Sequence, residues 1–511
     1  SMPEFLRAYI VVIALSILMF SLLLRLNVDF IKKADIKLWR NYWIAITTIS
    51  FFSSNIWVYM LLLTVLLSYA SASKLDRLSF FMAVLCASPM FKVTLPGFGL
   101  INFLIVLSYV NILTLLILVP EYKSKKASFS YPTNKLDSFV ILYVVLICLL
   151  NFRENTLTNS IRESINFIIA ILIPYYALSR VVSDTDKLKK ILFILFLCIA
   201  PLAIIGSFES IKHWKLYSSS IAHVLEYSKG TDYGVRGDSL RSSALFAGPL
   251  VLGYVMTTGI GLLIFVNKYT QKKNLIKILT LLFIVCLYYT KARGSWIGVL
   301  VLIILYIWSG PQKFSNLAKL TFGGAILFAI LSVTSVGQKI ISSLPFFSVE
   351  NSHEASTVDY RFRLLEQSWT LFQKNPMFGL AKYRETPEME VMRQGQGIID
   401  VVNSYVDIGL NYGLAGLSLF LLIFLGLLFT VLKAVKSLPA IEQDLINIGR
   451  VLFAVLGSML VMIVTVSSVD YIPVFYWVIG GLCSAYIKIC ANKRHLARAA
   501  NKPIPAYNYG N

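Results

Sequence analysis

Long stretches without a single charged residue constrain this chain more than any other feature of its sequence. Residues 10–24, 192–205, 297–308 and 417–432 are four of them. Such runs are typical of segments that cross the hydrocarbon layer of a membrane, which is about 30 Å thick. Apolar residues make up 57% of the chain and charged residues only 14%, against about 25% in soluble domains. The chain therefore folds in lipid.

Backbone groups in lipid must form their hydrogen bonds within the membrane, which leaves helices or a closed barrel. The apolar runs are continuous and lack the two-residue alternation of barrel strands. The sequence therefore predicts an all-α polytopic transmembrane helix bundle, one integral membrane domain over residues 1–511, with about 12–15 spans. We expect spans near residues 5–27, 98–119, 137–152, 161–180, 190–208, 244–267, 274–290, 294–309, 317–336, 408–432, 449–466 and 473–490.

Two early regions leave alternatives. Residues 41–70 can form one long helix or two short ones, and residues 78–96 can cross the membrane or re-enter it. Residues 5–27 read as a span and not as a cleaved signal, because further apolar runs follow directly.

The predicted topology explains where the residues behind the net charge of +21 lie. Basic residues gather between the expected spans, and placing these loops in the cytoplasm satisfies the positive-inside rule. The tail, residues 491–511, is then cytoplasmic. Basic loops on that side attract anionic headgroups, so membrane lipid is the expected partner of this charge and nucleic acid is not.

Two longer loops then lie outside the cytoplasm. One covers residues 209–241, and the other is a large extracytoplasmic loop over residues 337–407 whose charged part spans 337–400. Within it we expect an amphipathic helix that Asp359 caps and that Asn375-Pro376 ends. Its apolar residues recur at helical spacing and predict that it covers the membrane surface: Phe362, Leu365, Trp369 and Phe372.

Arginines at the outer ends of expected spans are the first candidates for chemistry. Arg293 lies in a tight outer turn between two spans, Arg241 precedes another span, and Arg361 opens the surface helix. Each one alone is explained by snorkelling to headgroups or by surface pairing. Three on one face favour a phosphate or diphosphate site, since the planar guanidinium binds such oxygens bidentately.

Three motifs around the large loop resemble those of the O-antigen ligase and O-antigen polymerase family. Residues 292–298 (Ala-Arg-Gly-Ser-Trp-Ile-Gly) are similar to the family's S-R-G-x-W-x-G. Arg361, with the Pro-x-x-Gly of residues 376–379, resembles its arginine helix and the exit from it. Asn403-Ser404-Tyr405, followed by Gly413 and Gly416, resembles the entry into the next span. The resemblance is sharpest over residues 236–432.

The resemblance implies a membrane glycosyltransferase that uses a polyprenyl-diphosphate-linked oligosaccharide, without metal or cofactor. It places the protein in the bacterial cytoplasmic membrane, with the active site on the extracytoplasmic face. Arg293 and Arg361 would bind the diphosphate or the neighbouring sugar, and Arg241 matches less sharply. The implied partners are the growing polysaccharide chain, a chain-length regulator and a flippase.

The chain departs from the family at two positions. Val402 stands where ligases carry a histidine, and Asn411 stands where they carry an acid. Because a histidine base is missing there, a carboxylate is the alternative proton acceptor. Asp400 is the first choice, although it can equally cap the next helix, and Glu209 is the second.

Four further residues are expected to bind substrate. Arg236 lies in the first outer loop and Arg363 on the surface helix. Asn403 and Tyr405 can orient substrate, or can only cap and pack. The six cysteines lie in apolar runs without paired spacing, and neither they nor the four histidines suggest a metal site.

Three functions follow in order of preference. The first is a polymerase that joins lipid-linked repeat units of an exopolysaccharide or O-antigen, to which the missing histidine points. The second is a ligase or oligosaccharyltransferase that moves glycan to lipid or protein. The third is a transporter of lipid-linked glycan, which broken helices or charges near the bilayer midplane would favour.

Overall fold

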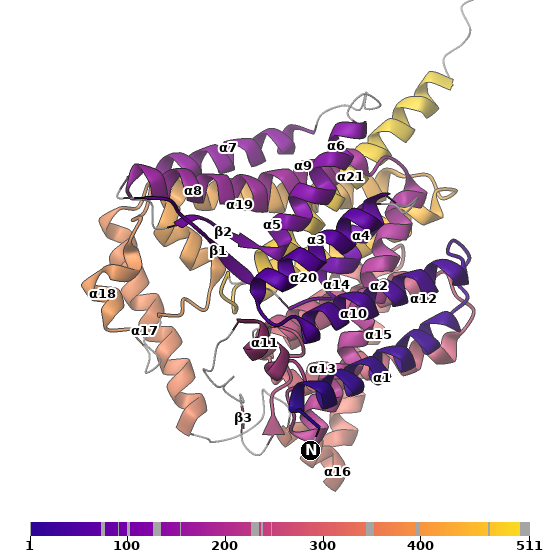
Figure 1. The fold of residues 1–511 in the computed structure, drawn as a ribbon. Helices are drawn as coiled ribbons and strands as arrows, with labels where there is room; N and C mark the ends of the chain where they lie inside the picture. The colour runs from indigo at the N-terminus through magenta and orange to yellow at the C-terminus, as the bar shows by residue number, and fades with distance from the viewer. Residues whose placement is uncertain are drawn as a thin grey trace, which may run out of the picture.

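The protein is a helix bundle, seen in a computed structural model as closely packed helices with two small hairpins at their edges (Figure 1). The structure describes residues 2–72, 77–89, 91–99, 103–125, 134–153, 155–225, 235–236, 239–246, 248–343, 352–393, 399–468 and 471–500. Among these residues, nine helices are long and apolar enough to cross a membrane, and two further apolar helices are shorter. The predicted all-α polytopic bundle is confirmed.

The first third of the chain contains short helices and one hairpin. Its elements are α1 (Glu4–Leu24), α2 (Lys33–Phe52), α3 (Ile56–Ala72), α4 (Arg77–Leu85), β1 (Lys92–Pro96), β2 (Phe103–Ser108), α5 (Tyr109–Leu113), the π-helix η1 (Thr114–Leu118) and α6 (Val119–Lys125). The region 41–70 thus forms parts of two helices. Since α4 has nine residues, it is about 13 Å long and too short to cross the hydrocarbon layer.

The span expected at residues 98–119 is wrong. Its first part is strand β2, which pairs antiparallel with β1, and its remainder is divided between α5 and η1. β-Branched Ile105 and Val106 favour the strand. Ser108 then starts a new helix, because its Oγ accepts a hydrogen bond of 3.3 Å from the backbone N–H of Asn111.

The rest of the chain builds the main bundle. Its elements before the large loop are α7 (Lys135–Leu150), α8 (Leu157–Phe167), the π-helix η3 (Ile168–Leu172), α9 (Ile173–Val181), α10 (Thr185–Lys212), α11 (Ser218–Leu225), β3 (Val235–Arg236), β4 (Ser239–Leu240), α12 (Pro249–Asn267), α13 (Lys273–Thr290), α14 (Arg293–Trp308), α15 (Lys313–Val333) and α16 (Ser335–Ser343). The large loop and the last spans contain α17 (Ser352–Lys374), the 3₁₀ turn η4 (Tyr383–Glu385), α18 (Pro387–Glu390), α19 (Ser404–Ser437), α20 (Gln443–Met462) and α21 (Tyr471–Ala500).

Four helices form the centre of the bundle. Most residues of the apolar parts of α10, α12, α20 and α21 are buried. Around them, α14 packs on α20, α9 on α21 and α7 on α19. By contrast, α15 has no buried residue, so its apolar side chains face the surroundings of the bundle. Figure 1 places α17 and α18 together at one side, beside the end of α8.

Helix α17 differs from its sequence prediction at its start. It begins at Ser352, so Asp359 lies within the helix and does not cap it. The Asp359 carboxylate instead pairs with Arg363 one turn later, at 2.9 Å. Asn375 and Pro376 follow the end of the helix, as expected.

The face of α17 that packs against the protein is a leucine face, opposite most of the aromatic residues expected to face the membrane surface. Phe362 and Trp369 are 68% and 61% exposed, whereas Leu364 and Leu371 are 3% and 1% exposed. The two leucines pack with Tyr383 and other residues of the following segment in a small separate core. The loop therefore folds over the leucine face and leaves the aromatic face uncovered.

Candidate functional site

The turn between α13 and α14 is as tight as the sequence predicts. Helix α13 ends at Thr290, Lys291 adopts a left-handed conformation (φ 52°), and Arg293 is the first residue of α14. The partial positive charge of a helix N-terminus favours anions. Arg293 adds a full charge at the same place, and its side chain is half-buried.

Arg241 lies at this turn as well. Its Nε donates a hydrogen bond of 3.0 Å to the carbonyl of Thr290. The next residue, Ser242, donates its backbone N–H to the carbonyl of Tyr289 at 3.2 Å. The structure therefore brings Arg241 and Arg293 to one turn, although 51 positions separate them in the sequence.

A short segment after α20, which we call the 463–468 turn, connects this turn to the start of α19. A side chain added at Gly294 would overlap the Thr465 side chain, so the two backbones lie close. On the other side, Ser404 donates its backbone N–H to the carbonyl of Ile463 (2.9 Å) and its hydroxyl to that of Val466 (2.8 Å). Sequence reasoning missed this turn, because it contains no motif and only Ile, Val, Thr and Ser residues.

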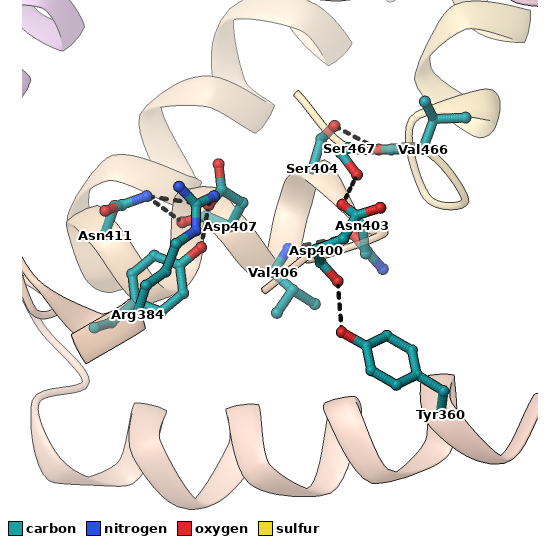
Figure 2. Close-up of polar contacts among 11 residues, drawn as sticks. Tyr360, Arg384, Asp400, Asn403, Ser404, Val406, Asp407, Asn411, Val466 and Ser467 are labelled. Atoms are coloured by element: carbon teal, nitrogen blue, oxygen red, sulfur yellow. Dashed lines mark hydrogen bonds and ion pairs between the residues drawn. The ribbon is translucent and has the colours of Figure 1, made fainter. Parts of the chain in front are cut away.

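The same turn holds Asp400. The Ser467 hydroxyl donates to a carboxylate oxygen of Asp400, which is half-buried. Tyr360 reaches the backbone of the same residue from α17, and its hydroxyl donates to the carbonyls of Asp400 (3.1 Å) and Met392 (3.2 Å). Figure 2 shows Tyr360 rising from α17 toward Asp400, with Ser467 on the other side.

These contacts bring Arg241, Arg293 and Asp400 to the region of the 463–468 turn. The start of α14 with Arg293 lies against the turn, Arg241 is bonded to the carbonyl of Thr290 just before α14, and Asp400 is bonded to Ser467. Arg361 is the residue after Tyr360 on α17. An arginine cluster beside a carboxylate can bind an anionic leaving group and accept a proton from a hydroxyl. We call this region the arginine site.

The start of α19 decides two alternatives left by the sequence. Asn403 is the N-cap, and its Oδ1 accepts from the backbone N–H groups of Tyr405 (2.9 Å) and Val406 (3.2 Å). Capping by Asp400 is therefore wrong. The Tyr405 hydroxyl donates to the carbonyl of Leu460 at 2.7 Å, and its ring contacts Phe420. Both Asn403 and Tyr405 thus have the capping and packing contacts.

Three other candidates lie apart from this cluster or are satisfied locally. Glu209 is fully buried in α10, where its carboxylate accepts from the backbone N–H groups of Leu216, Ser243 and Ala244 at 2.9–3.2 Å. Arg363 is mostly exposed and pairs with Asp359. Arg236 is placed in strand β3, and its side chain lies outside the described residues.

The Pro-x-x-Gly motif docks on a break in α19. Gly413 has φ 63° and ψ −162° inside the helix, and Gly379 has φ 68°. Leu380 donates to the carbonyl of Leu410 (2.7 Å), and Leu414 donates to that of Pro376 (2.8 Å). A side chain at either glycine would overlap backbone atoms of the other segment. The two glycines thus permit the large loop to lie directly against the helix.

Arg153, which sequence reasoning missed, fastens this junction. Its guanidinium donates to the carbonyls of Phe378 (2.7 Å), Gly379 (2.6 Å) and Asn411 (2.8 Å). Arg153 lies in the turn between α7 and α8, far away in the sequence. One basic residue after an apolar run gives no signal of such a role.

A second polar cluster lies next to the junction. Asp407 accepts from the Tyr383 hydroxyl, from Arg384 (2.9 Å) and from the side-chain amide of Asn411 (3.2 Å). Figure 2 shows this group on the left, apart from Asp400, Asn403 and Ser467 on the right. Burial raises the pKa of the Tyr383 hydroxyl, so it remains a donor at neutral pH. Asp407 lies one helical turn before Asn411, so a search at i−4 spacing could have found a nearby acid.

Within the part of the chain that the structure describes, no group of three or more His, Cys, Asp or Glu side chains lies together in a way that could hold a metal ion.

Comparison with known proteins identifies one family. Residues 278–421 match the sequence profile of the O-antigen ligase family. The matched region contains the motifs at 292–298, 376–379 and 403–416, together with Arg293, Arg361, Arg363 and Asp400, and it excludes Arg236, Arg241 and Glu209. A search of curated protein sequences found no match. The resemblance seen in the motifs is confirmed.

Proposed function

Since residues 278–421 carry the O-antigen ligase domain in a multi-pass membrane protein, we propose that the protein is a glycan polymerase. It joins polyprenyl-diphosphate-linked oligosaccharide repeat units at the extracytoplasmic face of the bacterial cytoplasmic membrane. The observation that supports the proposal is the arginine site. There Arg241 and Arg293 meet at the turn before α14, this turn lies against the segment whose Ser467 bonds Asp400, and Arg361 follows Tyr360, whose hydroxyl donates to the Asp400 carbonyl.

The arginine site fits the charge changes of such a transfer. A hydroxyl of the acceptor sugar attacks the anomeric carbon of the donor sugar, a new glycosidic bond forms, and the bond from that carbon to the diphosphate oxygen breaks. Negative charge then grows on the leaving diphosphate, where Arg293, Arg361 and the N-terminus of α14 stabilise it. The proton of the attacking hydroxyl moves to the Asp400 carboxylate.

Two features favour a polymerase over other transferases and over a transporter. Val402 stands where ligases of this family carry histidine, so the proton acceptor differs from theirs. Arg293 is the first residue of α14 and Arg241 precedes α12. Arg361 does not open its helix as the sequence predicts, but lies within α17, which is not one of the candidate spans. Charges of a transport path, by contrast, lie in the middle of spans. A ligase remains the second candidate, because the matched profile is that of the O-antigen ligase family.

A reconstituted reaction tests the proposal. Purified protein in lipid nanodiscs is given only lipid-diphosphate repeat units, and the product is resolved by size. We expect a ladder, and we expect EDTA to leave it unchanged. Product that forms only after lipid A or an acceptor protein is added would instead identify a ligase.

Variants test the residues separately. Arg293→Ala and Arg361→Ala should each lower the rate about 100-fold or more, as loss of a donor to developing charge does. Lys374→Ala on α17 is the control, because this exposed cation pairs with Glu388 away from the arginine site. The rate of the Asp400→Asn variant should fall by a similar factor. Near-normal turnover in this variant would exclude Asp400 as the base. Normal ladders in both arginine variants would overturn the diphosphate site.

A further inference from the structure

A polar pocket of about 350 Å³ lies beside the junction of α19 and the large loop, outside the arginine site. Its walls come from the turn between α7 and α8, from α8, from residues 381–385 and from α19. The volume is within the range of small-ligand sites. None of Arg241, Arg293, Arg361 and Asp400 lines it.

The floor of the pocket is held in place by contacts already described. Arg153 ties the α7–α8 turn to the carbonyls of Gly379 and Asn411. Tyr383 and Arg384 are bonded to Asp407. These lining residues are therefore fixed from behind, so the pocket is formed before any ligand arrives.

Three charged side chains of the lining are available for a ligand. Glu163, Lys382 and Glu385 are exposed, and among the described residues none of their side chains forms a hydrogen bond or an ion pair; Glu385 and Lys382 are joined only through their backbones. Two lining amides are already used as donors. The Nδ2 of Asn155 donates to Asn151, and that of Asn411 donates to Asp407. The side-chain oxygens of both residues are therefore the atoms that can accept a hydrogen bond from a ligand.

This lining selects a ligand rich in hydroxyl groups. Carboxylates and amide oxygens accept from hydroxyls, while Lys382 and Arg384 donate to them. Glu163 and Glu385 repel a phosphate or diphosphate, because like charges at short range are unfavourable. The Tyr412 ring in the wall offers an apolar surface to one face of a sugar. Neutral or amino sugars satisfy all of these groups.

We propose that this pocket binds a sugar unit of the acceptor glycan chain. The pocket and the arginine site share α19: Asn411 and Tyr412 line the pocket, and Asp400 precedes the same helix. Asn411 lies about two helical turns into α19, so a chain held in the pocket can extend along this helix toward Asp400, while its diphosphate-linked partner occupies the arginine site. This assignment rests on the proposed function, in which two glycans meet.

Binding of a free oligosaccharide tests the pocket. The probe is the repeat-unit oligosaccharide released by mild acid from the lipid-linked pool of the host cell, so that it carries no diphosphate. Saturation-transfer NMR on the full-length protein in nanodiscs gives its affinity. Replacing Glu163, Lys382 and Glu385 together by Ala should weaken binding about 10-fold or more, the effect of losing one hydrogen bond to a charged group.

Control variants keep the test interpretable. Glu366→Ala changes an exposed acid on α17 outside the pocket and should bind as the wild type does. The double variant Glu163→Gln/Glu385→Gln keeps the shape of the lining, so weaker binding in it supports the proposal even where the triple Ala variant is unstable. Unchanged affinity in both pocket variants would overturn it.

Two further arms separate this proposal from the proposed function. Inorganic diphosphate should not displace the oligosaccharide from the wild-type protein. If it does, and if the pocket variants no longer show this displacement, the pocket is an anion site instead. Arg293→Ala should bind the oligosaccharide normally. If the arginine variants retain full polymer synthesis while the pocket variants lose oligosaccharide binding, the diphosphate site fails and the carbohydrate pocket stands.

Discussion

The break in α19 at Gly413 leads to a sharp prediction for Gly413→Ala. The backbone angles of Gly413, φ 63° and ψ −162°, lie in a region that is essentially restricted to glycine. A side chain there would also overlap backbone atoms of Met377. Because those atoms are backbone, the large loop itself must move to make room.

The structure gives the size of the effect and a matched control. Holding a non-glycine residue in this conformation costs about 1–3 kcal/mol, before any cost of moving the loop. Gly409 lies one turn earlier in the same helix, and a side chain there would meet only Leu417 and Phe372 at ordinary contact distances of 3.8 and 3.9 Å. Gly409→Ala should therefore be neutral or should stabilise the helix by about 1 kcal/mol.

Amide hydrogen exchange measures the difference where it arises. The backbone N–H groups of Leu380, Leu414 and Ala415 bond across the junction. In Gly413→Ala they should exchange about 5- to 150-fold faster, which corresponds to the loss of 1–3 kcal/mol of local stability. Exchange rates equal to those of Gly409→Ala would refute the argument that the loop and the helix depend on this glycine.

Two further predictions use other contacts of the large loop. Arg153→Ala should speed amide exchange of Leu380 and lower polymer yield. Arg153→Lys should restore neither, because an ammonium cannot bridge three carbonyls as the planar guanidinium does. Wild-type behaviour of the lysine variant would contradict this prediction. The hydrogen bond from Lys374 lowers the pKa of Glu388 below its usual value, so this pair stabilises the loop at neutral pH and stops doing so as the pH falls through the lowered pKa. Any difference in Tm between wild type and Glu388→Gln should therefore shrink as the pH falls below about 4.3, the ordinary pKa of glutamate, and vanish below the lowered pKa. A difference that is the same at about pH 7 and about pH 3 would show that the pair is not its cause.

Sequence patterns predicted the bundle well, because apolar runs report directly on burial in lipid. They failed at residues 103–108, which are as apolar as a span. Their pairing with 92–96 depends on a turn and on β-branched residues, and hydropathy does not report on either. On α17, two apolar faces compete, and helical spacing alone could not tell that Leu364 and Leu371 would be covered while Phe362 and Trp369 would not.

The site was predicted in part for a related reason. Arginines near span ends and family motifs pointed to Arg293 and Asp400, which lie at the 463–468 turn, and to Arg361 on α17, whose place in a site stays a prediction. Ser467, Thr465 and Arg153 gave no signal, because their roles come from contacts with residues far away in the sequence. Such contacts are specified by the packing of whole helices, and a single sequence does not display them.

Arg153 also has a consequence for how the protein is made. The carbonyl of Asn411 that it binds is supplied 258 residues later. Chains are synthesised from the N-terminus, and segments that emerge early fold early. Helices α7 and α8 are therefore synthesised before the carbonyl of Asn411 that binds Arg153 exists. The junction closes only after translation has passed residue 411, so a chain truncated before that point would contain its first helices but never form the contact between the large loop and α19.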